Sequence, residues 1–220
     1  MTIQEAYSRH LKNKRVALVG GADNFSYSEL FERDIVVTVN DHCIRQKIKP
    51  DVIYHVIRGP DLWNALIRLL DTPPKFFWGS IRDDPYERGI SDYRDVDEFV
   101  NEWHRPPEQW VGHFAAGEWD GPNPYGEEYE WLNQIHHKYD CKLLTGLVGL
   151  ADIMRYEPEE IFVCGMDLYL DNLRGRPGYR DSHRIQGNID FINDARDDGR
   201  VTLDTPLVKS LDEYRRRVNE

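Results

Sequence analysis

Short apolar runs that alternate with helix-like segments constrain the fold of this chain more than any other feature. Most of these runs are rich in Val and Ile and almost continuously apolar, which is typical of strands covered on both faces. They lie at residues 15–20, 35–40, 51–56, 75–78, 161–165 and 201–203. The spacing predicts helices at residues 26–31, 42–48, 61–70, 127–139, 145–156 and 207–218. The alternation therefore predicts an α/β fold with a doubly wound, mostly parallel sheet and helices on both faces.

The alternation is interrupted between about residues 80 and 125. Prolines and tryptophans are interleaved there with many acidic residues, a composition typical of irregular structure. We interpret this range as an insertion or lid. Because the chain has 220 residues and no internal repeat, we expect a single domain over residues 1–220.

The charge balance argues against several classes of partner. The chain has 28 Lys and Arg against 39 Asp and Glu, a net charge of −11. A general nucleic-acid-binding or anionic-lipid-binding surface is therefore not expected. No stretch approaches the roughly 20 consecutive apolar residues of a membrane span, and the N-terminus lacks an apolar leader, so we expect a cytoplasmic protein.

Cysteine and histidine spacing indicates neither a disulfide framework nor a metal site. The cysteines, at positions 43, 141 and 164, are odd in number and form no CxxC pair, so we expect small reduced core residues. The histidines fit no metal-ligand spacing of the HExxH type. The sequence therefore predicts no bound metal.

Two segments place backbone amides where an anion can bind. The run VALVGGADN at 16–24 is a strand that enters a turn at Gly20 and Gly21, where amides can approach a ligand closely. It lacks the third glycine of GxGxxG and the lysine of a P-loop, and an ordinary turn explains it equally well. Thr145 and Gly146 precede an apolar helix, so Thr145 is predicted to cap it beside free amides, with a plain cap as the alternative.

Two further segments carry side chains suited to catalysis. Asp167, Tyr169 and Asp171 follow the strand at 161–165, and functional groups gather at the carboxyl ends of strands in such sheets. His183 lies in a loop rich in arginine and has the side chain best suited to remove a proton near neutral pH. The alternatives are a turn cap and packing for the first segment and a solvated loop for the second.

Taken together and in this order, the four segments resemble the sialyltransferase-like glycosyltransferases, the bacterial and animal-type families that use CMP-sialic acid. The first motif is similar to VALVGG at 16–21 and to VTVN at 37–40. The second is similar to LLTGLVGLADIMRYEPEEIFVCGMDLY at 143–169, and the last to the Ser182–His183 pair. This chain departs from the bacterial pattern in the first loop, which reads GGADN, and beyond the pair, where Gln186 and Gly187 follow.

The resemblance implies a sialyltransferase-like variant of the GT-A fold that transfers a sugar from a CMP-activated donor to an acceptor hydroxyl. The transfer would invert the anomeric carbon and need neither a metal nor another cofactor. His183 would be the base, and Tyr169 would assist the leaving phosphate. The residues that would bind the donor nucleotide are Gly20, Gly21, Asn24, Asn40, His55, Thr145, Gly146 and Asp167.

Two other hypotheses remain open at this point. The run KPDVIY at 49–54 is similar to one in a pterin pyrophosphokinase-like family, which would imply ATP and Mg²⁺. That strand continues with His55 and lacks the pair of aspartates that such a metal site needs. The second hypothesis is a non-catalytic scaffold that binds a nucleotide or a partner through the aromatic, acidic range at 80–131.

Overall fold

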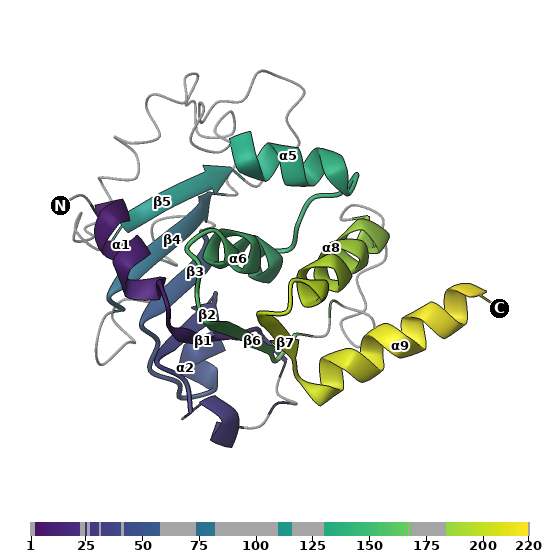
Figure 1. The fold of residues 1–220 in the computed structure, drawn as a ribbon, viewed down its shortest axis with the longest axis horizontal. Coiled ribbons are helices and arrows are strands. Elements are labelled where there is room, and N and C mark those ends of the chain that lie inside the picture. The colour runs from purple at the N-terminus through teal and green to yellow at the C-terminus, as the bar shows by residue number, and fades with distance from the viewer. Residues whose placement is uncertain are drawn as a thin grey trace.

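In the computed structural model, seven parallel strands form one sheet in the order β5-β4-β3-β2-β1-β6-β7 (Figure 1). The structure describes residues 3–22, 25, 27–30, 32–40, 42–57, 74–81, 110–115, 130–166, 168 and 184–219. The strands are β1 (Arg15–Val19), β2 (Ile35–Val39), β3 (Val52–Ile57), β4 (Phe76–Ile81), β5 (Trp110–Ala115), β6 (Glu160–Cys164) and β7 (Val201–Leu203). The α/β class and the parallel sheet predicted from the sequence are therefore confirmed.

The predicted strands match β1 to β4, β6 and β7, but β5 was not predicted. It lies inside the range interpreted as an insertion or lid, and it pairs with β4 from Phe77 to Ile81. Residues 110–115 therefore belong to the sheet and extend it by one edge strand. The rest of the 80–125 range, apart from residues 80 and 81 at the end of β4, lies outside the described residues.

The helices are α1 (Ile3–Leu11), η1 (Tyr27–Leu30), α2 (His42–Arg45), α5 (Glu130–Lys138), α6 (Thr145–Met154), α8 (Ile185–Asp197) and α9 (Thr205–Asn219). Each predicted helix that falls on described residues has a counterpart among them, although η1 is a 3-10 turn. The helices α1 and α8 lie outside all the predicted helix ranges. The helix expected at 61–70 lies outside the described residues. Among the described residues, no helix has both the length and the apolar composition that a membrane crossing requires.

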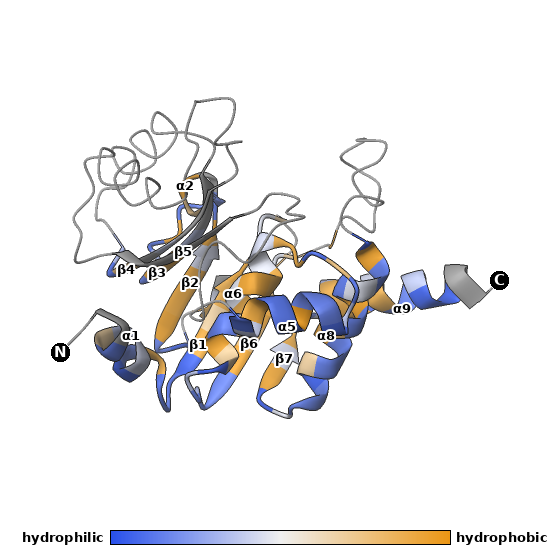
Figure 2. Cartoon of the chain, turned by 90° about the horizontal axis from the view of Figure 1, so that it is seen from above, coloured by the Kyte–Doolittle hydropathy of each residue, from blue (hydrophilic) through white to orange (hydrophobic). Residues whose placement is uncertain are grey.

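Each central strand is buried on both faces because its residues alternate between two cores. In β1, Val16 and Leu18 enter the larger core, to which α1, α5, α6, α8 and α9 contribute, whereas Ala17 and Val19 enter a smaller core on the other face. The smaller core also contains Phe25 and Leu30 of η1. Figure 2 shows the hydrophobic colouring of the central strands and hydrophilic residues on α5 and α8. This burial explains why the strands read as continuous apolar runs.

The strand order indicates where along the carboxyl ends of the strands a ligand-binding crevice is expected. The chain moves from β1 to β2 on one side of the sheet, and β6 pairs with the other side of β1. The order therefore reverses next to β1, and crevices form at the carboxyl ends of strands where this happens. Residues that directly follow β1, β2 and β6 are thus brought to one edge.

Candidate functional site

The glycine turn after β1 is pressed against the end of β6. The Gly20 amide donates to the Cys164 carbonyl at 2.8 Å, and the Ala22 amide donates to the Gly165 carbonyl at 2.7 Å. Gly165 has a φ of 62°, in the left-handed region that favours glycine. A Cβ atom built at Gly20 would lie closer than 3.0 Å to the Gly165 carbonyl oxygen. Only glycine therefore allows β1 and β6 to approach this closely.

The other side of this turn is covered by α2. A Cβ atom built at Gly21 would lie 2.5 Å from Cε1 and 2.7 Å from Cδ2 of His42, so the imidazole packs directly on the Gly21 backbone. Gln46, which is buried, donates from Nε2 to the Ala22 carbonyl at 3.2 Å. Sequence reasoning missed His42 and Gln46, because only the position of α2 after β2 brings them to the glycine turn.

Asn40 follows β2 in a left-handed conformation, with a φ of 56°. Its amide donates to the Tyr54 carbonyl on β3 at 2.7 Å. The β1–β2 register pairs Val19 with Thr38, so Gly21 and Asn40, each two residues further on, lie at the same level of the edge. Asparagine is one of the few residues that adopt this conformation readily, so the backbone turn at this position explains the residue type.

The first turn of α6 lies over the ends of β2 and β6. A Cβ atom built at Gly146 would lie 2.7 Å from Cε of Met166 and 3.6 Å from Cγ2 of Val39. The prediction that Thr145 caps this helix is wrong. Leu144 occupies the N-cap position in an extended conformation and makes no side-chain capping hydrogen bond, and Thr145 is the first helical residue.

Asn188 on α8 fixes the segment that leads into α6. Its side chain is completely buried. Oδ1 accepts a hydrogen bond from the Leu144 amide at 2.9 Å, and Nδ2 donates to the Lys142 carbonyl at 3.1 Å. Asn188 therefore anchors the segment before α6 to α8, although no local motif marks it in the sequence.

A buried polar cluster fixes α6 to the sheet below this edge. The Tyr54 hydroxyl donates to Oδ2 of Asp152 at 2.6 Å and lies 2.5 Å from the Tyr7 hydroxyl. Nη1 of Arg155 donates to Oδ1 of Asp152 at 3.1 Å. Burial raises the pKa of Asp152 to about 6, against the opposing effect of its hydrogen bonds to Tyr54 and Arg155. The cluster connects α1, β3 and α6.

The structure thus brings together five of the residues predicted to form the site: Gly20, Gly21, Asn40, Thr145 and Gly146. His55 lies in β3, paired in register with Gly79 of β4, and its side chain is outside the described part of the structure. Asn24, Asp167, Tyr169 and His183 also lie outside the described residues. Their roles stay predictions from the sequence.

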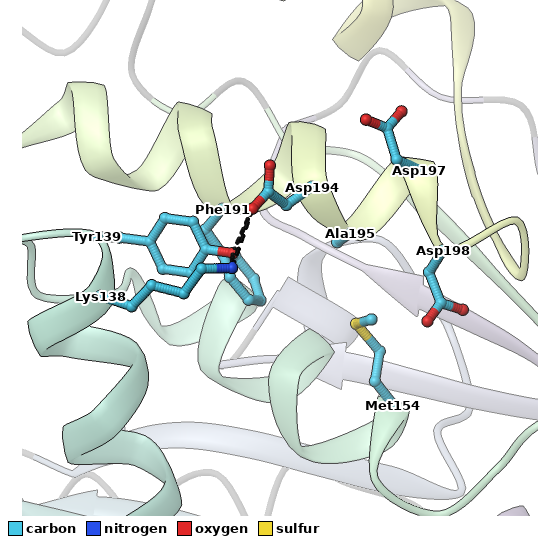
Figure 3. A pocket seen from close by; sticks show the side chains of 8 residues that line it. All are labelled: Lys138, Tyr139, Met154, Phe191, Asp194, Ala195, Asp197 and Asp198. Atoms are coloured by element: carbon cyan, nitrogen blue, oxygen red, sulfur yellow. Dashed lines mark hydrogen bonds and ion pairs between the residues drawn. The ribbon is translucent and has the colours of Figure 1, made fainter.

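A pocket of about 410 Å³ lies elsewhere, beside α5, α8 and the end of α6 (Figure 3). Three of its polar side chains are bonded together: Lys138 and the Tyr139 hydroxyl both donate to Oδ2 of Asp194, at 3.1 and 2.8 Å. Met154, at the end of α6, lines it. Because α6 starts at the carboxyl edge of the sheet, this pocket lies toward the opposite edge and is separate from the candidate site.

The cysteine prediction is confirmed. All three cysteines are described and buried, and they form no disulfide with one another. Burial raises the pKa of Cys141 to about 11 and also raises that of Cys164, so both thiols stay protonated near neutral pH. Within the described residues, no group of three or more His, Cys, Asp and Glu side chains is placed to hold a metal ion.

Comparison with known proteins identifies the fold. No family model and no curated protein sequence matches the chain. Among solved structures, it is similar to the sialyltransferase CstII from Campylobacter jejuni in complex with a substrate analogue, CMP-3FNeuAc, with a TM-score of 0.53 and 13% identity over 86% of this chain and 78% of that one. The same enzyme with cytidine-5'-monophosphate gives a TM-score of 0.52 with the same identity and coverage.

A third solved structure agrees with these two. The α-2,3-sialyltransferase from Campylobacter jejuni in apo form matches with a TM-score of 0.51 and 14% identity, over 86% of this chain and 73% of that one. At identities this low, the similarity shows the fold alone. Each match covers most of both chains. The chain therefore has the sialyltransferase-like α/β fold.

Proposed function

We propose that this chain is a glycosyltransferase that transfers a sugar from a CMP-activated donor to an acceptor hydroxyl. The observation that carries the proposal is the meeting of the glycine turn, Asn40 and the start of α6 at one carboxyl edge of the sheet. Two of the solved structures that share the fold are complexes with CMP or with a CMP-containing substrate analogue. The shared fold supports a nucleotide donor at the corresponding edge here.

The start of α6 is suited to the donor's phosphate or carboxylate. The first amides of an α-helix have no partner within the helix, and they form the positive end of its dipole. Leu144 adds no side-chain cap, but its carbonyl accepts the Leu147 amide at 2.8 Å, so the amides proposed for an anion are those of the first two helical residues. In the proposal, Thr145 and Gly146 bind the anionic group of the donor.

The glycine turn and Asn40 are assigned to the nucleotide. Because they have no side chains, Gly20 and Gly21 let the turn pack between Gly165 and His42, and the proposal is that this backbone shape forms the surface on which the nucleotide lies. Asn40 offers a side-chain amide that can donate and accept hydrogen bonds. By the same resemblance, Asn24, His55 and Asp167 are proposed as further donor contacts.

The proposed chemistry is a direct displacement at the anomeric carbon. His183 removes the proton from the acceptor hydroxyl, whose oxygen attacks the anomeric carbon as the bond to the CMP phosphate breaks. The electron pair of that bond leaves with CMP, and Tyr169 donates a hydrogen bond to the departing phosphate. The configuration is inverted. Tyrosine and helix amides can stabilise a single leaving phosphate without a metal, so the proposal includes no metal. The cytoplasmic location stays a prediction from the sequence.

The experiment that tests this function is turnover of CMP-sialic acid with a panel of glycan acceptors, followed by NMR. We expect CMP release with an inverted anomeric configuration in the first product and a rate unchanged by EDTA. His183→Ala is expected to lose about 10²- to 10⁴-fold in rate, the usual contribution of a general base, while His137→Ala, an exposed control on α5, loses none. Retained configuration would contradict the mechanism, and equal rates for both variants would remove His183 from it.

A further inference from the structure

Asp204 is a buried carboxylate at the junction of β7 and α9, next to the candidate site (Figure 1). It is 4% exposed. Oδ1 accepts a hydrogen bond from the Leu207 amide at 2.9 Å, and Oδ2 accepts one from the Gly165 amide at 3.0 Å. The Asp204 amide itself donates to the Val163 carbonyl on β6 at 2.9 Å. The residue thus joins the start of α9 to the end of β6.

Only one of these two side-chain bonds serves the helix. A capping side chain needs one acceptor for the amide of the third helical residue, here Leu207, and a serine hydroxyl is sufficient for this. A buried carboxylate is more costly, and burial raises the pKa of Asp204 even though the Leu207 and Gly165 amides lower it. The second oxygen therefore has a separate role, which is to hold Gly165.

The bond to Gly165 continues directly into the glycine turn. The Gly165 amide donates to Oδ2 of Asp204, and the Gly165 carbonyl accepts a hydrogen bond from the Ala22 amide at 2.7 Å. Its left-handed backbone, with a φ of 62°, lies against Gly20. Because glycine has the widest choice of backbone conformations, loss of the Asp204 bond frees this position more than it would free any other residue.

We propose that Asp204 is a positioning residue of the candidate site: its Oδ2 atom holds the Gly165 turn and, through it, the Gly20–Ala22 backbone in the conformation that binds the donor nucleotide. The inference rests on the proposed function. It makes the β7–α9 junction, which carries none of the sequence motifs, part of the binding machinery. It also predicts that donor binding and not acceptor binding depends on Asp204.

The experiment separates the two hydrogen bonds of Asp204. In Asp204→Ser the shorter side chain still caps α9 but cannot also reach Gly165. The control is Asp34→Ser. Asp34 precedes β2, and its carboxylate accepts a hydrogen bond from the Arg15 amide at 2.9 Å. This contact lies at the amino ends of the strands, away from the candidate site. Amide hydrogen exchange and CMP titration are measured for both variants, together with donor and acceptor KM.

We expect the Gly165 and Ala22 amides of Asp204→Ser to exchange at least about tenfold faster and the Leu207 amide to be unchanged, because one lost hydrogen bond corresponds to roughly that factor. The Kd for CMP and the donor KM should rise by a similar factor, with the acceptor KM unchanged. In Asp34→Ser, the exchange rates of these amides, the Kd for CMP, the donor KM and the acceptor KM should all equal those of the wild type. Unchanged Ala22 exchange together with unchanged CMP affinity would overturn the proposal.

Two further outcomes keep the test decisive. If Asp204→Ser does not fold, Asp204→Asn replaces it: the amide keeps one acceptor and turns a donor toward the other N–H group, so one of the two amide positions must still exchange faster. If the wild type binds no CMP, the proposed function fails. The Ala22 exchange rate then still decides whether Asp204 holds the turn.

Discussion

The backbone of Gly20 lies so close to the Gly165 carbonyl oxygen that a Cβ atom at Gly20 would come within 3.0 Å of it. The contact is made by two neighbouring parallel strands at the point where each one ends, and the hydrogen bond from Ala22 to Gly165 closes it at 2.7 Å. Because a backbone atom cannot turn aside as a side chain can, this contact defines the shape of the candidate site.

Gly20→Ala should therefore damage both the fold and the site. The added methyl group overpacks the contact and forces the two strands apart, which typically lowers the free energy of unfolding by about 1–3 kcal/mol. We also expect CMP affinity to fall at least about tenfold. Urea denaturation and isothermal titration measure the two effects. Gly199→Ala is the control, because Gly199 also has a positive φ, 79°, but among the described residues no atom lies within 4 Å of its Cβ position. Equal CMP affinity in the two variants would contradict this role of Gly20.

The contact between Gly21 and His42 predicts coupling between two substitutions. A methyl group at residue 21 must displace the imidazole, since Cε1 would lie 2.5 Å away. We expect Gly21→Ala to weaken CMP binding in the wild-type background and to do so much less in a His42→Ala background, where the space is open. A double-mutant cycle measured by titration calorimetry gives this interaction energy, expected at about 0.5–3 kcal/mol. Additive effects of the two substitutions would show that displacement of the His42 imidazole is not the reason why Gly21→Ala weakens CMP binding.

The buried Asp152 carboxyl predicts an unusual dependence of stability on pH. Its pKa is about 6 in the folded chain and about 3.9 in an unfolded one. Between these values the folded state holds a proton that the unfolded state has released, so the free energy of unfolding falls as pH rises from about 4 to about 6. The full difference is roughly 3 kcal/mol and is constant at higher pH.

Asp152→Asn isolates this contribution, because the amide can still accept the hydrogen bond from Tyr54 and has no carboxyl to titrate. Relative to the wild type, the variant should gain stability as pH rises from 4.5 to 7, with urea denaturation as the measurement. Asp212→Asn, at an exposed position on α9, should show the same dependence of the free energy of unfolding on pH as the wild type. A parallel profile for Asp152→Asn as well would show that the carboxyl titrates normally.

Asn188 is predicted to be the most sensitive polar residue of α8. Asn188→Ala removes the hydrogen bonds to the Leu144 amide and the Lys142 carbonyl, and each lost hydrogen bond lowers the free energy of unfolding by about 0.5–1.5 kcal/mol. Thermal and urea unfolding measure the loss. Asn193→Ala on the same helix is the control, since its buried Oδ1 atom makes no hydrogen bond with any residue that the structure describes. A comparable loss in both variants would show that the helix itself, and not the start of α6, depends on these residues.

The central part of the fold was predictable from the sequence because it is encoded locally. Strands such as β1, β2 and β6 are buried on both faces, so nearly every residue is apolar. The edge strand β5 was not predictable in this way. Its sequence, WVGHFA, contains a glycine and a histidine and lies among prolines and acidic residues, and only pairing with β4 defines it as a strand.

The site was predictable only in part, for the same reason. Glycines 20 and 21 and Asn40 directly follow strands, so the topology of the fold was enough to place them together. His42, Asn188 and Asp204 act through contacts with residues 21, 44 and 39 positions away in the chain. Thr145 was assigned to the cap because threonine is a common capping residue, whereas the extended backbone of Leu144 takes that position.

The central claim is that this edge of the sheet binds CMP, and thermal unfolding with CMP, UDP, GDP and ATP, each with and without Mg²⁺, tests it most directly. A ligand at 100 times its Kd adds about 2.7 kcal/mol of stability, which for a domain of this size raises Tm by about 5–11 °C. We expect CMP alone to do so, equally with and without Mg²⁺. The tenfold or greater loss of affinity expected for Gly20→Ala lowers this shift to about half or less at the same CMP concentration. A response to ATP that requires Mg²⁺ would contradict the account in favour of a pyrophosphokinase-like enzyme, and no response to any nucleotide would contradict it in favour of a non-catalytic scaffold.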